Sequence, residues 1–282
     1  MPAFLTAREK CARLADLAVC ALIAESELTP KPALVDGRGP GAHTDLSLDL
    51  LMRSAQSLRD YFEQMARASF CRPPGRRLRE RLGSIGRAAE SSMLRVTNGT
   101  NTHRGAIWAL GLLVSSSAME SESPEAIAHR AGEIAQLPDR SAPNTETNGK
   151  RAGRRYNLSG AREEAVAGFP HVVSAALPAL RRSRWNDETE THAGLNALLA
   201  IMADLDDTCL LHRGGLAALT AAKHGAAAVI EAGGTSTQRG WQLLLELDRE
   251  LLRQNSSPGG SADLLAATFF LDFVDRSLST TK

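Results

Sequence analysis

Two polar segments of the chain combine histidine, arginine and glycine just before a long apolar stretch. They occupy residues 101–106 and 207–215, and the candidate binding or catalytic residues within them include Asn101, His103, Arg104, His212, Arg213, Gly214 and Gly215. A helix N-terminus has free N–H groups, an arginine adds a fork of donors, and a glycine lets a ligand reach the backbone. Each segment therefore suits a phosphate group. Two of them predict a substrate with several phosphates, or two phosphorylated substrates.

A loop rich in glycine and proline, at about residues 29–44, carries a second group of candidate residues. Lys31 lies between two prolines, which stiffen the backbone and fix the direction of its cation. Asp36, His43 and Asp45 follow it along the chain. They could bind a divalent metal ion or serve as acid and base. The alternative is a turn in which Asp45 caps the next helix.

Three carboxylates, Asp204, Asp206 and Asp207, directly precede the second His-Arg-Gly segment. The apolar period before them predicts a helix that ends here, with Asp204 and Asp207 on one face. Carboxylates at a helix C-terminus are unfavourable for the helix dipole, and Mg²⁺ or nearby arginines would offset that. We therefore expect these residues to bind Mg²⁺, with Asp207 also a candidate catalytic residue. An acidic surface patch is the alternative.

Two further segments are weaker signals of the same kind. Arg162 and Glu164 lie near a Gly-Phe-Pro motif, and residues 257–263 form another glycine-rich helix start. The polar segment at about residues 139–160 contains four basic residues between positions 150 and 155. It is either a solvated, flexible loop or a mobile lid over an anionic ligand.

The elements that must position these residues are helices. Apolar residues recur at helical spacing along most of the chain, and the alternating pattern of strands is almost absent. The first helix opens with a capping box of Thr6 and Glu9 and ends before Pro30. Further helices are predicted at about residues 46–69, 76–97, 102–119, 124–136, 161–167, 170–183, 188–206, 214–232, 237–254 and 259–279. The sequence thus predicts a single all-α catalytic domain of about ten helices over residues 1–282.

Composition narrows the class of protein. The chain is 43% hydrophobic with a net charge of +1, so it can bury a core but has no basic field for nucleic acid. Aromatic residues make up only 4%, too few for a platform on which bases stack. The four cysteines are scattered, and no uncharged apolar run is long enough to span a membrane. We expect a soluble, cytoplasmic protein that binds small molecules rather than nucleic acid or membrane.

At these same segments the sequence resembles the triphosphoribosyl-dephospho-coenzyme A synthases, which make the prosthetic-group precursor for the acyl carrier subunits of malonate decarboxylase and citrate lyase. The matching segments span the chain in the family's order: residues 29–36, 41–45, 101–107, 160–165, 168–170, 207–208, 212–215 and 257–265. Three positions depart from the family's usual residues, namely Ala33 for glycine, Arg104 for lysine and Cys209 for asparagine. The lysine-to-arginine change keeps the charge but replaces a point cation with a fork.

The resemblance implies a glycosyl transfer from ATP to dephospho-CoA. The 2′-hydroxyl of dephospho-CoA attacks the anomeric carbon of the ATP ribose, adenine leaves, and the triphosphate stays on the product. Such a reaction needs a carboxylate near the anomeric carbon, a base for the hydroxyl and a proton for adenine, while Mg²⁺ and cations hold the triphosphate.

The roles that the resemblance implies divide into two sets. The catalytic set is Asp36, His43, Asp45, Asp207 and His212. The set that binds substrate and phosphate is Lys31, Asn101, His103, Arg104, Arg162, Glu164, Arg213, Gly214 and Gly215, with Asp204, Asp206 and Asp207 as Mg²⁺ ligands.

Other functions remain open at this point. The same reaction could serve citrate lyase, although the chain length and the absence of a fused second transferase domain favour malonate decarboxylase. An all-α, metal-dependent nucleotide phosphohydrolase would also use histidine and aspartate, and a nucleotide-binding regulatory module would bind ATP without releasing adenine. We expect the product to pass to an acyl-carrier-protein transferase, and an apolar helical surface could support a homodimer.

Overall fold

The chain folds into helices, as the spacing of its apolar residues predicts. The computed structural model describes residues 6–119, 123–143, 151, 155–156, 158 and 160–279, and within these ranges it contains no β-strand. The all-α prediction is therefore confirmed. The helices are α1 (Ala7–Glu27), α2 (Leu48–Ser57), α3 (Arg59–Ser69), α4 (Arg76–Val96), α5 (Arg104–Ser117), α6 (Pro124–Gln136), α8 (Ala161–Val166), the π-helix η1 (His171–Ala176), α9 (Leu177–Trp185), α10 (Glu190–Asp204), α11 (Thr208–Glu231), α12 (Gln238–Arg253) and α13 (Gly259–Ser279).

Side-chain caps explain several of the helix starts. Thr6 and Glu9 form the predicted capping box at the start of α1. Ser47, Ser123 and Thr189 each accept a backbone hydrogen bond in the first turn of α2, α6 and α10. These local signals set where the helices begin, and their apolar faces then decide how they pack.

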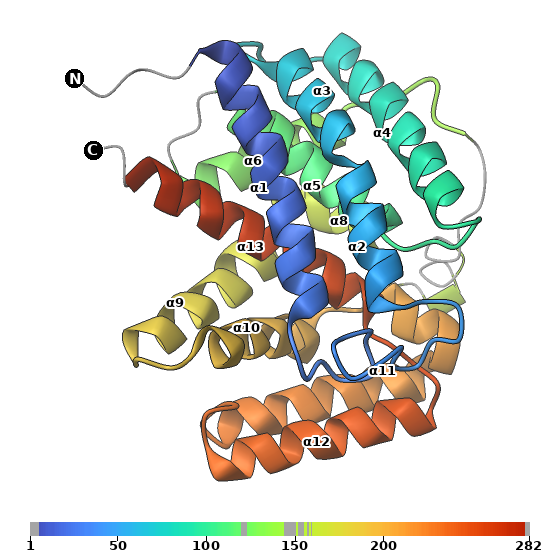
Figure 1. Ribbon diagram of the computed structural model, residues 1–282, viewed down its shortest axis with the longest axis vertical. Coiled ribbons are helices and arrows are strands. Elements are labelled where there is room, and N and C mark those ends of the chain that lie inside the picture. Colours follow the sequence, from blue (N-terminus) through green and yellow to red (C-terminus); the bar gives the residue numbers. More distant parts are fainter. Residues whose placement is uncertain are drawn as a thin grey trace.

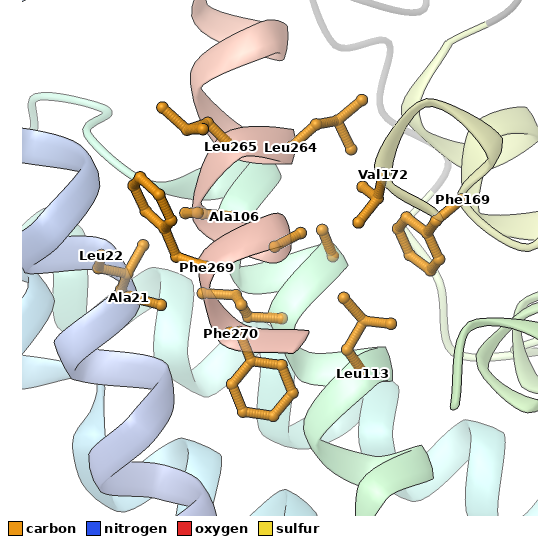
Figure 2. Packing of buried hydrophobic residues seen from close by; sticks show 14 of the residues in the cluster. Ala21, Leu22, Ala106, Leu113, Phe169, Val172, Leu264, Leu265, Phe269 and Phe270 are labelled. Atoms are coloured by element: carbon orange, nitrogen blue, oxygen red, sulfur yellow. The ribbon is translucent and has the colours of Figure 1, made fainter. Parts of the chain in front are cut away.

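Helix α13 runs through the middle of the molecule and organises the core (Figure 1). It packs against α1, α5, α10 and η1. Figure 2 shows Phe269 and Phe270 of α13 between Leu22 on one side and Leu113 on the other, and both leucines are buried. Each phenylalanine buries enough apolar surface to contribute about 2 kcal/mol. This packing fixes the position of α13, and therefore of its first turn, relative to the neighbouring helices.

The loop at residues 28–47 lies against the pair formed by α11 and α12 (Figure 1). Its Ala33 N–H donates to Asp248 Oδ1 of α12 at 2.8 Å, and Arg213 of α11 donates to the Ala42 carbonyl at 2.9 Å. These bonds hold the glycine- and proline-rich loop in one place, so that its polar side chains have defined neighbours.

Three predicted helix boundaries were wrong. The helix predicted at 46–69 is two helices that meet at Leu58, and the one predicted at 170–183 is η1 followed by α9. The helix predicted to start at 214 begins instead at Thr208, although Gly215 interrupts it with φ 65° and ψ −157°. Because α10 ends at Asp204 and α11 begins at Thr208, Asp204 and Asp207 do not share a helix face.

The segment predicted as a flexible loop at 139–160 is only partly within the described residues, and Lys150 and Arg154 lie outside them. Its start is anchored, because Arg87 donates to the buried carboxylate of Asp139 at 2.8 Å. Arg140 pairs with Glu80 of α4. No helix among the described residues has the length and apolar character needed to cross a membrane.

Candidate functional site

The starts of α11 and α13 meet at one buried carboxylate, that of Asp207. Asp207 is the N-cap of α11 and accepts from Cys209 N–H at 2.8 Å. It also accepts from the Gly260 and Ser261 N–H groups of α13 at 3.2 and 2.8 Å, and from the Ser261 hydroxyl at 2.9 Å. Burial raises the pKa of Asp207, and these donated bonds oppose that shift. One side chain thus satisfies the first turns of two helices.

A second carboxylate, Asp263 of α13, lies against the first turn of α5. It accepts from the Ala106 N–H, and a Cβ added to Gly105 would come within 1.9 Å of its Oδ2. The glycine of the first His-Arg-Gly segment therefore makes room for a carboxylate of the protein itself. Burial, with the charges of Glu25 and Asp207, raises the pKa of Asp263 well above its usual range.

Lys31 and Glu25 form a buried ion pair beside this carboxylate. The Lys31 ammonium lies 2.6 Å from Glu25 Oε1 and 2.5 Å from the Glu25 carbonyl in the last turn of α1. Its side chain is 1% exposed. A cation at the C-terminus of α1 complements the helix dipole and satisfies a carbonyl that would otherwise be unpaired. The predicted phosphate ligand is thus bonded within the protein.

His103 lies behind the same cluster and is buried. It is the N-cap of α5, one position before the first turn in which it was predicted. Its Nδ1 bonds to the Ser54 hydroxyl at 2.9 Å, and its buried Nε2 has no hydrogen-bond partner among the described residues. Burial, with the nearby Lys31 ammonium, lowers the pKa of His103 to about 4, so the ring is neutral.

His43 connects the loop at 28–47 to α11 and to the segment before α13. Its Nδ1 lies 2.9 Å from Arg213 Nη2, and its Nε2 lies 2.8 Å from the Ser257 hydroxyl. Because arginine only donates, Nδ1 must accept and the ring proton must be on Nε2. Burial and the Arg213 charge lower the pKa of His43 to about 4. Asp45, with a side chain 60% exposed, lies 3.8 Å from His43 Nδ1.

Asp36 of the same loop is occupied by a turn and an arginine. It accepts from the Lys31 and Arg38 backbone N–H groups, each at 2.8 Å, and from the Arg38 guanidinium. Arg38 also pairs with Asp248 of α12 at 2.7 Å. These contacts make Asp36 a fixed point of the loop.

The second His-Arg-Gly segment lies inside α11, around the interruption at Gly215. Its backbone there is in a region that only glycine adopts readily. A Cβ on Gly214 would come within 2.4 Å of the Ser256 hydroxyl oxygen, and one on Gly215 within 3.3 Å of the Tyr156 hydroxyl oxygen. His212 and Arg213 are exposed beside this interruption. The break within α11 therefore lies one residue after the helix start predicted at 214, next to two exposed basic side chains.

The three carboxylates that were predicted to bind Mg²⁺ point to different partners. Asp204 is 86% exposed, Asp206 pairs with Lys223 at 2.7 Å, and Asp207 is the buried double cap. Among the described residues no group of three histidine, cysteine, aspartate or glutamate side chains could hold a metal ion.

Glu164 pairs with a histidine that the sequence did not single out. His171 donates from its backbone N–H and from Nδ1 to the Glu164 carboxylate, at 3.1 and 2.7 Å. Its Nε2 lies 3.6 Å from Asp204 Oδ2, and the hydrogen bond with Glu164 raises the pKa of His171. The ring projects from η1, and single turns of π-helix are frequent at functional sites.

Two arginines, Arg104 and Arg162, lie at the starts of α5 and α8. Arg104 pairs with Glu90 of α4 at 2.5 Å, and its N–H bonds to the Asn101 side chain at 3.2 Å. Trp108, one turn further, donates to the Ala161 carbonyl at 3.1 Å, and this bond brings the start of α8 next to α5. Arg162 is exposed on this helix.

The structure thus brings together residues from the loop at 28–47 and from the starts of α5, α11 and α13. Glu25 and Asp263 belong to this cluster, but sequence reasoning had not selected either as a site residue. The glycine-rich run before Asp263 was a usable signal, because a helix start is where a ligand contact or a cap can lie. Glu25 and His171 carried no local signal.

Comparison with known proteins gives a consistent result over nearly the whole chain. The model of the ATP:dephospho-CoA triphosphoribosyl transferase family matches residues 11–282. A probable 2-(5''-triphosphoribosyl)-3'-dephosphocoenzyme-A synthase of Pseudomonas fluorescens is 53% identical over 267 residues, covering 94% of this chain and 92% of the relative. Relatives with the same description in Pseudomonas aeruginosa and Azotobacter vinelandii are 56% and 53% identical, over 92% and 94% of this chain and 89% and 92% of theirs. No solved structure matches the chain.

Proposed function

Because the chain belongs to the ATP:dephospho-CoA triphosphoribosyl transferase family, it is a transferase, and we propose that its reaction takes place where α5, α11 and α13 begin. The substrates that the family description names are ATP and dephospho-CoA. Transfer of the triphosphoribosyl group breaks the bond between ribose and adenine and leaves the triphosphate intact. The bond that breaks is thus separated from the phosphates by the ribose ring.

The observation that carries this location is the gathering of carboxylates beside exposed arginines. Glu25, Asp207 and Asp263 come from three different parts of the chain, and the charges of Glu25 and Asp207 both act on Asp263. Positive charge develops at the anomeric carbon when an N-glycosidic bond breaks, and carboxyl groups beside it can stabilise that charge when ionised or protonate the departing base when neutral. Burying several carboxyl groups together lowers the stability of the fold, which favours a catalytic role for the cluster over a purely structural one.

The phosphate-binding groups that we propose are the exposed cations and the interrupted helix near this cluster. Arg213, His212 and the backbone after Gly215 form one set, and Arg104 with Arg162 forms the other. Two sets suit two substrates that both carry phosphates. Lys31 is left out, because its ammonium is buried against Glu25.

The roles of the remaining residues follow from what each side chain is free to do. Asp207 and Asp36 already accept several hydrogen bonds, so we assign them to holding the site in shape. His43 orients Arg213 through its neutral ring. Asp45 is the exposed carboxylate of the same loop, and we assign it to accepting the proton of the attacking hydroxyl. Holding two nucleotides in the right geometry supplies much of the remaining rate.

Mg²⁺ fits this site as a partner of the triphosphate rather than of a protein cage. The ion commonly uses one or two carboxylates together with substrate phosphates. Asp204 is the exposed member of the three predicted ligands and would be the one to hold it. When bound, the ion would neutralise phosphate charge and orient the triphosphate.

We propose malonate decarboxylase as the enzyme that receives the finished prosthetic group. The product would pass to an acyl-carrier-protein transferase and then to the carrier subunit. The test is to add each carrier protein, with its own transferase, to the product of this enzyme. We expect the prosthetic group to be attached to the carrier of malonate decarboxylase and not to that of citrate lyase at low enzyme concentration.

The reaction itself is tested by chromatography of an incubation with ATP, Mg²⁺ and dephospho-CoA. We expect free adenine only when both substrates are present. A phosphohydrolase would instead release phosphate or pyrophosphate from ATP alone, and a regulatory module would bind ATP without forming adenine.

A further inference from the structure

Three carboxylates, those of Glu25, Asp207 and Asp263, lie near the start of α5, and only Asp263 among them is partly exposed. Glu25 is buried and paired with Lys31, and Asp207 is buried and accepts from three backbone N–H groups and one hydroxyl. Asp263 is partly exposed, accepts from the Ala106 N–H, and has no ion-pair partner among the described residues.

The position of Asp263 is tightly defined. Its carboxylate lies over Gly105, where any larger residue would collide with Oδ2. It projects from the first turns of α13, whose start is fixed by Asp207. A group held this closely loses little entropy when a substrate binds, which is what an acid or base in catalysis needs.

We propose that Asp263 is the acid that gives a proton to the departing adenine. The inference rests on the proposed function, since it assigns a residue to that reaction. In the step, the bond between the anomeric carbon and adenine N9 breaks, and its electron pair goes to adenine. Asp263 delivers a proton to a ring nitrogen of adenine, and the 2′-hydroxyl oxygen bonds to the anomeric carbon and gives its proton to Asp45. Exchange with water then returns a proton to Asp263 and removes one from Asp45.

The charges around Asp263 favour its protonated form before the reaction. Glu25 faces it from α1, and Asp207 from the start of α11. Burial and the Asp207 charge raise the pKa of the Cys209 thiol well above its usual range, so this neighbouring thiol stays neutral. The nearby cation of Lys31 is neutralised by Glu25. A carboxyl among carboxylates stays protonated where an exposed one would ionise, and so can act as a general acid.

The test compares two leaving groups in the Asp263→Asn variant. Adenine needs a proton to leave, whereas 6-chloropurine leaves without one. With ATP we expect kcat for release of the base to fall by about 100- to 10,000-fold, the usual range for a lost general acid. With the 6-chloropurine analogue of ATP we expect a fall of less than about 10-fold. An equal loss with both substrates, or no loss with ATP, would overturn the assignment.

A matched control lies on the same helix. Asp275 of α13 pairs with Arg181 at 2.8 Å, well along the helix from the site, and Asp275→Asn should leave both rates unchanged. Release of adenine from ATP by the wild-type enzyme tests the proposed function separately. If the wild type releases no adenine, the proposed function itself is wrong, whatever the role of Asp263.

If Asp263→Asn does not fold, Asp263→Glu keeps the proposal testable. A longer carboxyl sits differently among Glu25 and Asp207, so the decline of kcat with ATP at high pH should begin at a different pH in this variant. The rate with the 6-chloropurine analogue should show no such decline in either protein. An unchanged pH profile with ATP would contradict the role of Asp263.

Discussion

Two histidines of the site, His43 and His103, are held in their neutral form by burial. His103 shows this most simply, because within the described part of the chain no carboxylate pairs with it and its Nδ1 bonds only to a serine hydroxyl. A neutral ring can accept or donate a hydrogen bond but cannot add a positive charge beside Lys31. The residue chemistry thus keeps the acidic cluster from being neutralised by a neighbouring imidazolium.

This burial predicts how stability depends on pH. The pKa of His103 is about 4 in the folded protein and about 6.5 when unfolded, so the unfolded state binds more protons between these values. The free energy of unfolding should therefore fall as the pH drops from about 6.5 to 4, by on the order of 3 kcal/mol for one such group. Urea unfolding of the wild type and of His103→Gln at pH 7, 5.5 and 4.5 measures this.

The variant is expected to be less stable at pH 7 but to lose less stability on acidification. Parallel pH dependences in the two proteins would show that His103 does not titrate in this way.

At the scale of elements, the site depends on two helix starts that share one cap. Asp207 satisfies the first turns of both α11 and α13, whereas an ordinary N-cap serves one helix. The start of α13 carries Asp263, and α11 carries Arg213. A change at Asp207 should therefore move both a proposed acid and a proposed phosphate ligand.

Asp207→Asn is expected to abolish adenine release and to lower the free energy of unfolding by about 2 to 4 kcal/mol, because the amide leaves buried donors unpaired. Ser123→Ala, which uncaps α6 alone, is the control and should cost about 1 kcal/mol without affecting turnover. Chemical denaturation and an adenine assay measure both effects. Near-normal turnover in Asp207→Asn would refute the importance given to this cap.

The interruption of α11 at Gly215 is the second element-scale feature. Its φ of 65° and ψ of −157° are accessible almost only to glycine, so Gly215→Ala should cost about 1 to 3 kcal/mol or straighten the helix. Either outcome displaces the backbone after Arg213, and we expect the KM for a phosphorylated substrate to rise. Gly75→Ala serves as the control, because Gly75 has extended backbone and open space around it.

Steady-state kinetics with each substrate varied in turn would measure the change. If Gly215→Ala leaves the KM for both ATP and dephospho-CoA unchanged, the backbone at Gly215 takes no part in binding phosphate.

At the scale of the molecule, the sequence predicted most of the helices but not the contacts between their first turns. The capping box of Thr6 and Glu9 and the 3.6-residue period are local, so they survive folding unchanged. The contact between Gly105 and Asp263 joins residues far apart in the chain, and no local pattern reveals it. The glycines were recognised as points of close approach, but the group that approaches Gly105 is a carboxylate of the protein.

The predicted Mg²⁺ site at residues 204–207 also depended on contacts that no local pattern reveals. Asp204, Asp206 and Asp207 are neighbours in sequence, and a continuing helix would have kept two of them on one face. The helix ends between them, so each side chain meets a different element: η1, α11 and α13. Sequence proximity at a helix boundary is thus a weak predictor of a shared metal site.

The most direct test of the account is the mass of the product formed from ATP and dephospho-CoA. We predict one species that carries dephospho-CoA joined to a ribose with all three phosphates, formed in equal amount with adenine. Adenine with an unattached ribose triphosphate, or a product that has lost phosphate, would contradict transfer of an intact triphosphoribosyl group.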